Sequence, residues 1–218
     1  MPSEEYKEEN MRQVLIAAMC CFEQYGVYTT TLKMIAKKSG LTIRSLSRYF
    51  GTKDNLIVKA LAFYLDEYNS SAKSIYTAPQ YLKLSGYEQI KYMLNQRTTY
   101  TIQHPGLTLC VADIESYLAH NQIGEELRPI YNDYMRFMKQ VIKSALEKGL
   151  EDKTLSSTIN IEQTIYFLYE TFNCVLKRLP ILYYNALTDQ LEESKAYMEC
   201  FVLSALGNLG SVNSQEKI

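Results

Sequence analysis

Hydrophobic residues recur every three or four positions along most of the chain, which is the spacing of one face of an α-helix. The pattern predicts a first helix over residues 11–26, a short helix ended by Gly40, another over 43–50, and a longer one from residue 53 to about 70. No stretch of useful length alternates as a half-buried strand would. We therefore expect an all-α protein.

Farther along, the same spacing predicts five helices that are bounded by prolines and glycines. They cover residues 87–103, 106–120, 123–149, 159–179 and 188–209. Pro129 lies inside the third of these, so that helix is expected to begin after it or to be kinked there. Residues 76–86, which contain Pro79 and Gly86, are expected to be an irregular connection, and residues 211–218 a polar tail.

Residues 29–56 contain the clearest local signals. Thr30 is expected to cap the first of two short helices, Gly40 to end it in a left-handed conformation, and Thr42 to cap the second. Two short helices joined by a tight turn form a helix-turn-helix, in which the second helix enters the major groove of DNA. Between Tyr28 and Ala60 there are seven lysines and arginines and a single acidic residue, Asp54, which suits binding to phosphates.

The motifs F-x-x-x-G, T-T-x-x-x-I-A and L-x-x-Y-F-x-x-K-x-x-L follow one another at fixed spacing from Phe22 to Leu56. This run resembles the TetR family of bacterial transcriptional regulators, whose heads carry these motifs, and it covers roughly the first quarter of the chain. Arg44 stands where the family often has glycine, and Ser47 where it often has tyrosine. The DNA-binding residues that we expect from the exposed positions and the resemblance are Thr30, Thr31, Lys33, Thr42, Ile43, Arg44, Ser45, Ser47, Arg48, Tyr49 and Lys53.

The expected organisation is an N-terminal three-helix DNA-binding head followed by a larger helical body for ligand binding and dimerisation. We place the head at residues 1–52 and the body at 53–218, with 53–70 as the connecting helix. Lys53 is expected to contact phosphate at the start of that helix.

The last two helices are apolar over more than one face, which requires cover on several sides. Self-association is the simplest cover, and the resemblance implies a four-helix bundle between two subunits. The interface residues expected on this ground are Phe172, Val175, Met198, Phe201, Val202 and Ala205.

The chain has 19 tyrosines and 7 phenylalanines but no tryptophan. For any single aromatic residue, core packing is the simpler explanation. A buried tyrosine hydroxyl needs a partner, however, so an interior rich in tyrosine suits a cavity that binds a small molecule. The ligand-binding residues expected are Tyr100, Tyr117, Tyr134, Phe137, Tyr166 and Tyr169.

Other chemistry has little support in the sequence. The five cysteines show no zinc-site spacing and are expected to be buried thiols, with a redox switch as the alternative. His104 and His120 are a weak candidate for a metal or haem pair, so no metal and no cofactor are expected. The longest apolar run is too short for a bilayer and the acidic start does not resemble a signal peptide, which predicts a cytoplasmic protein without membrane contact.

The leading hypothesis is a homodimeric repressor that binds a double-stranded DNA operator and is released by a small apolar or amphipathic effector. The alternative is a ligand-blind DNA-binding protein of the same fold whose body docks on another protein. A cavity of some hundreds of Å³ favours the first, and a sealed body the second. An enzyme is not expected, because no G-x-S-x-G, P-loop, G-x-G-x-x-G or H-E-x-x-H motif is present.

Overall fold

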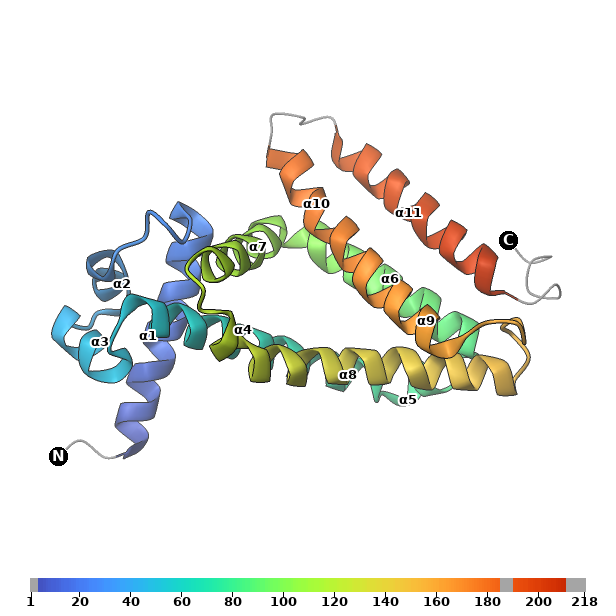
Figure 1. Ribbon diagram of the computed structural model, residues 1–218, viewed down its shortest axis with the longest axis horizontal. Coiled ribbons are helices and arrows are strands. Elements are labelled where there is room, and N and C mark those ends of the chain that lie inside the picture. Colours follow the sequence, from blue (N-terminus) through green and yellow to red (C-terminus); the bar gives the residue numbers. More distant parts are fainter. Residues whose placement is uncertain (1–3, 185–189, 211–218) are drawn as a thin grey trace. The chain divides into compact units, whose positions relative to one another are not determined.

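The computed structural model describes residues 4–184 and 190–210. These residues are helical apart from short connections and a single isolated bridge between Leu155 and Gly210 (Figure 1). The helices are α1 Glu4–Tyr25, α2 Leu32–Ser39, α3 Ile43–Phe50, α4 Lys53–Tyr76, α5 Pro79–Leu82, α6 Gly86–Gln103, α7 Pro105–His120, α8 Gly124–Glu151, α9 Ile161–Tyr166, the π-helical segment η1 Phe167–Thr171, α10 Phe172–Tyr184 and α11 Gln190–Leu209. The expected all-α fold class is confirmed.

Two compact units share the chain. The head unit contains the chain up to Asn69 together with Leu109–Tyr134, and the body unit contains Ser70–Thr108 and the chain from Met135 onward. The boundary that we placed at residue 52 therefore does not coincide with the packing. Most of α4 and most of α7 belong to the head unit, because their apolar faces complete its core.

The core of the head unit collects side chains from α1, α2, α3, α4 and α7. Its largest fully buried members are Phe22, Ile35, Leu46, Leu56, Ile57, Leu61, Ile114 and Leu118. On α7, Cys110, Ile114 and Leu118 lie at intervals of four residues and so occupy one face of the helix. The three N-terminal helices therefore share a core that α4 and α7 complete.

In the body unit, α6 packs against both α10 and α11, and these two pack against each other (Figure 1, green, orange and red). Ile90, Met93 and Leu94 of α6 and Phe172 of α10 are almost completely buried. The buried Arg97 of α6 donates a hydrogen bond to the Asn173 side chain, and its guanidinium lies 5.4 Å from the centre of the Phe172 ring. A mixed apolar and polar contact thus joins α6 to α10.

The start of α6 is fastened to the end of α8. Ser85 and Glu88 form a capping box, and the Gly86 amide donates to Asp152 at 2.8 Å. Burial opposes ionisation of Asp152, but hydrogen bonds from Thr154 and Gly86 outweigh it and lower the pKa of that carboxyl. The close approach of the two backbones is possible only because Gly86 has no side chain.

Several element boundaries differ from the sequence-based expectations. Helix α1 begins at Glu4, where two glutamates favour a helix N-terminus. Helix α4 extends to Tyr76, and a short helix lies within the connection that we expected to be irregular. Helix α8 begins before Pro129, and α10 continues through Pro180 to Tyr184. The polar tail and residues 188–189 of the last expected helix lie outside the described residues.

No helix in the described ranges combines the length and the apolar character that crossing a bilayer requires.

Gly86→Ala should destabilise the body unit. An added Cβ would lie 2.1 Å from the Gly149 amide nitrogen, and backbone atoms cannot rotate away. We expect a loss of about 3 kcal/mol or more in the free energy of unfolding, measured by urea denaturation. Gly207→Ala is the matched control, because nothing lies within 4 Å of its added Cβ. A helix-interior alanine should leave stability unchanged or raise it by up to about 1 kcal/mol.

Candidate nucleic-acid interface and body pocket

The turn between α2 and α3 consists of residues 40–42, and its conformation depends on Gly40 and Thr42. Gly40 ends α2 with φ 72°, a left-handed conformation that favours glycine. Thr42 caps α3, since its Oγ1 accepts the Ser45 amide at 3.1 Å and lies 3.1 Å from the Ser45 hydroxyl. The expected roles of Gly40 and Thr42, and the predicted range of α3, are confirmed.

Helix α3 separates an inner from an outer face. Leu46 and Phe50 are buried in the head core. The expected DNA-binding residues Thr42, Ile43, Arg44, Ser47 and Arg48 are exposed, and Ser45 is half-buried. The outer face thus combines two guanidinium groups, hydroxyl groups and one apolar side chain, Ile43, which is 46% exposed. These groups suit base edges, phosphates and thymine methyl groups.

Arg48 and Tyr49 act as a pair. The Arg48 Nη2 donates to the Tyr49 hydroxyl at 3.0 Å, and the guanidinium carbon lies 4.9 Å from the centre of the Tyr49 ring. Tyr49 is half-buried and packs against the head core, as its helical position predicts. Its ring therefore supports Arg48 on the outer face.

Thr30 does not have the role that we expected. The N-cap of α2 is Thr31, whose side chain accepts the Met34 amide. Thr30 is buried, and its hydroxyl donates to the carbonyl oxygens of Cys21 at 3.1 Å and Gly26 at 2.8 Å. A buried and bonded hydroxyl cannot reach phosphate, so we remove Thr30 from the DNA-binding set. Thr31 and Lys33 are exposed and stay in it.

Lys53 is also bonded within the protein. Its Nζ donates to the carbonyl oxygen of Val27 at 2.8 Å and to that of Tyr28 at 3.3 Å. Burial lowers its pKa, although Asp54 acts in the opposite direction. The structure therefore places Lys53 as a link between the start of α4 and the turn after α1, and not as the exposed phosphate contact that we expected.

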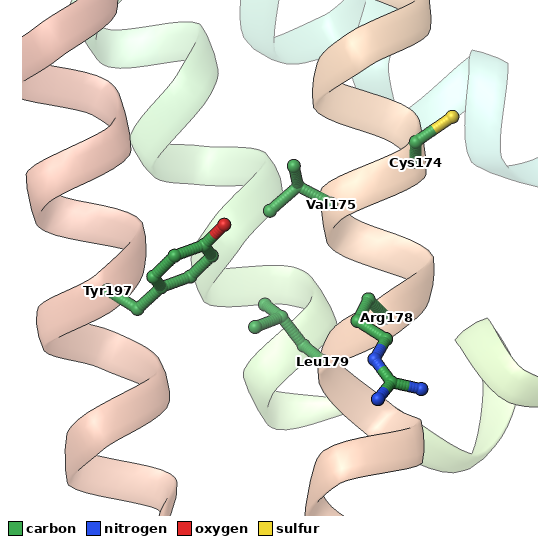
Figure 2. A pocket seen from close by; sticks show the side chains of 5 residues that line it. All are labelled: Cys174, Val175, Arg178, Leu179 and Tyr197. Atoms are coloured by element: carbon green, nitrogen blue, oxygen red, sulfur yellow. The ribbon is translucent and has the colours of Figure 1, made fainter.

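The body unit has a pocket of about 420 Å³ between α10 and α11. It is lined by Cys174, Val175, Arg178, Leu179 and Tyr197. Val175 and Leu179 extend from α10 toward Tyr197 of α11, whereas Cys174 and Arg178 extend from another side of α10 (Figure 2). Pockets of a few hundred Å³ with mostly apolar walls and few polar groups are typical of small-molecule sites.

None of the six tyrosine and phenylalanine residues expected to bind ligand lines this pocket. Tyr117 and Tyr134 belong to the head unit, while Tyr100, Phe137, Tyr166 and Tyr169 belong to the body unit. Tyr166 is 65% exposed, which contradicts its placement in an interior. Tyr169 is buried, and its ring already contacts a cation of the protein, because the Lys139 Nζ lies 5.1 Å from the ring centre.

The expected dimer residues need a similar correction. Phe172, Met198, Val202 and Ala205 are buried within the protomer, so they cannot form a first contact with a partner. Helices α10 and α11 pack against α6 and against each other, which covers apolar sides of both helices within the protomer. Val175 and Phe201 are half-buried. Among the side chains of α9, η1 and α11 that the structure describes, the large apolar ones that remain exposed are Tyr166, Phe167, Tyr197 and Leu203.

Sequence reasoning missed the pocket residues. Val175 was expected at a dimer interface, and Cys174 was treated as a buried thiol although it is exposed. Arg178 offered a charge-based signal, since it and Lys177 are adjacent cations within a mostly apolar helix. That signal does not say which neighbouring helix supplies the opposite wall.

Comparison with known proteins identifies the N-terminal segment. The family model described as "Bacterial regulatory proteins, tetR family" matches residues 14–60, the segment that contains the helix-turn-helix. Residues 14–60 thus carry the DNA-binding segment of the TetR family of transcriptional regulators. The resemblance noted in the sequence is thereby confirmed.

Among curated proteins, the chain is similar to the HTH-type transcriptional regulator HbdR of Aromatoleum sp. (strain CIB). The two are 36% identical over 61 residues, which is 28% of this chain and 27% of HbdR. The chain thus matches only about a quarter of the length of this relative.

Solved structures resemble nearly the whole chain. A TetR transcription regulator from Haloarcula marismortui has a TM-score of 0.73 at 13% identity, covering 94% of this chain and 100% of that one. The regulator FadR of Bacillus subtilis, in complex with stearoyl-CoA, has a TM-score of 0.65 at 15% identity, covering 88% and 97%. At such identities the likeness establishes the fold alone.

Substitutions on α3 and α2 should affect DNA binding differently. Arg44→Ala or Arg48→Ala should cost about 1–3 kcal/mol at the cognate site and relax base preference if the guanidinium contacts guanine. Lys33→Ala should weaken all sequences alike and reduce the salt dependence by about one unit of slope, as loss of a phosphate contact does. Titrations with operator and unrelated duplexes at several salt concentrations measure both effects. Parent-like binding by all three variants would contradict the assigned surface.

Proposed function

We propose that the protein is a homodimeric repressor that binds an operator through α3 and is released by a small apolar or amphipathic ligand. The observation that carries the DNA-binding part is the outer face of α3, where Arg44 and Arg48 are exposed opposite the buried Leu46 and Phe50. Selection of genomic fragments with purified protein tests it. Failure to enrich any sequence over bulk DNA would contradict this function.

Dimerisation is supported by the exposed apolar residues of the body unit. Phe167 is 42% exposed and stacks at 6.4 Å on Phe201, and Leu203 of α11 is 43% exposed. Exposed apolar side chains gathered on neighbouring elements indicate an interaction surface. A two-fold dimer would present the same surface from both protomers and would carry two heads about 34–36 Å apart, as successive major grooves require.

A ligand is supported by the pocket between α10 and α11. Its volume favours the ligand-responsive hypothesis over a ligand-blind protein with a sealed body. Val175 and Leu179 offer apolar contacts, while Arg178 and the Tyr197 hydroxyl offer polar ones, so an amphipathic molecule fits the lining. The stearoyl-CoA complex of FadR, which has a similar fold, adds support by analogy.

Ligand binding and dimerisation would then both depend on α11. Tyr197 lines the pocket from α11, and Leu203 lies farther along the same helix. A ligand that separates α10 from α11 would change the surface that sets the distance between the two heads. A coupling of about 1–3 kcal/mol would change operator affinity by roughly 5- to 150-fold.

Phe167→Glu and Leu203→Glu should each convert the parent dimer to monomers, because a charge would have to be buried at the interface. Sedimentation at micromolar concentration measures the mass, and operator affinity should fall because linked heads bind with an effective concentration that a single head lacks. Ile75→Glu, at a residue 37% exposed on α4, should leave the mass unchanged. A monomeric parent would disprove dimerisation.

Tyr197→Ala should weaken the response to a compound that releases the parent from its operator. Removing the aromatic wall should raise the releasing concentration by at least about tenfold, since it deletes a large apolar contact. Tyr25→Ala, at an exposed tyrosine of α1, is the control and should respond like the parent. If Tyr197→Ala also responds at the parent concentration, the effector binds elsewhere.

A further inference from the structure

Four side chains of the head unit converge on the start of α4. The Tyr117 hydroxyl, from α7, donates a 2.8 Å hydrogen bond to the Asp54 carboxylate. The Tyr28 ring lies edge-on to the Tyr117 ring with a centroid distance of 4.9 Å. The Lys53 Nζ, which holds the Val27 and Tyr28 carbonyls, lies 5.7 Å from the Tyr117 ring centre. This group joins α7, α4 and the turn after α1.

The hydrogen bond can affect α3 because Asp54 lies close to the end of that helix in the chain. Asp54 lies in the first turn of α4, and only Gly51 and Thr52 separate that helix from the end of α3 at Phe50. The connection is tight, because Gly51 has φ 72° and Thr52 caps α4 by accepting the Asn55 amide at 3.1 Å. A rotation of the first turn of α4 therefore moves α3 as well.

Apolar packing alone does not define this rotation. Cys110, Ile114 and Leu118 bury one face of α7 in the head core, and such contacts have little directional preference. The Tyr117 hydrogen bond requires a particular geometry between α7 and the first turn of α4. The Lys53 bonds to the Val27 and Tyr28 carbonyls hold the first turn of α4 to the turn after α1, and the Tyr117 bond is the directional contact that holds it to α7.

Tyr117 remains a hydrogen-bond donor to Asp54 at physiological pH. Burial, together with the hydrogen bond to Asp54, raises the pKa of Tyr117 to about 12, so the phenol keeps its proton at physiological pH. A carboxylate in the first turn of a helix is favoured by the helix dipole. A neutral donor and a charged acceptor form one of the stronger classes of hydrogen bond.

We propose that Tyr117 is a positioning residue for DNA recognition, which holds the first turn of α4, and through it α3, in the orientation that reads the operator. Tyr117 thus serves the head rather than the effector pocket in which we first placed it. The inference rests on the DNA-binding part of the proposed function. It needs neither an effector nor dimerisation.

Tyr117→Phe tests the proposal, since it removes the hydroxyl and keeps the ring. We expect operator affinity to fall about tenfold, whereas affinity for an unrelated duplex of equal length stays at the parent value, because the phosphate contacts remain. The slope of affinity against salt concentration should not change. Tyr25→Phe, which removes the same hydroxyl from an exposed tyrosine of α1, should bind both duplexes like the parent.

A double-mutant cycle identifies the partner. Asp54→Ala should lower the ratio of operator to unrelated-duplex affinity about as much as Tyr117→Phe does, and the second substitution should then add little. Asp54→Asn keeps an acceptor oxygen and should retain more of the ratio than Asp54→Ala. Comparing Tyr117→Phe within one Asp54 background removes the effect of the lost charge.

Two outcomes would overturn the proposal while leaving the proposed function intact. In the first, Tyr117→Phe binds the operator as the parent does. In the second, affinity for both duplexes falls by the same factor, as expected when the substitution only reduces the folded fraction. A parent that selects no DNA at all would instead overturn the proposed function, and this inference with it.

Discussion

Helix α3 is too short to hold its own position. It spans Ile43–Phe50, and helices of this length are marginal in water without tertiary packing. Its stability comes from the Thr42 cap and from burying Leu46 and Phe50 in a core supplied by α1, α2, α4 and α7. Because the inner face does all of the packing, the outer face is free to carry arginine and serine. The position of the DNA-binding face thus depends in part on α1, α4 and α7, which carry none of the residues kept in the DNA-binding set.

This dependence explains why α7 belongs with the head. Cys110, Ile114 and Leu118 complete the core that the three N-terminal helices begin. A segment far along the chain can then influence the position of α3 through packing and through the Tyr117 hydrogen bond to Asp54. A division of the chain at residue 52 would separate α3 from the residues that hold it.

Local signals in the sequence were sufficient to predict α3 and the turn before it, since Gly40 and Thr42 form hydrogen bonds with residues close in the chain. They were insufficient where two equivalent residues compete. Thr30 and Thr31 are both possible N-caps, and Thr30 is excluded only because the turn after α1 buries its hydroxyl. Lys53 shows the same limit, because its carbonyl partners lie 25 and 26 residues earlier in the chain.

For α10 and α11, helical periodicity was insufficient to predict a dimer interface, for a different reason. Periodicity shows which positions are apolar, but not which neighbour covers them. Phe172, Met198 and Val202 satisfy the pattern of a dimer interface, and yet they are buried by helices of the same protomer. Phe167 of η1 and Leu203 of α11 are exposed instead. Only residues left exposed after the protomer has completed its own core are available to a partner, so an interface can be proposed only once that core is known.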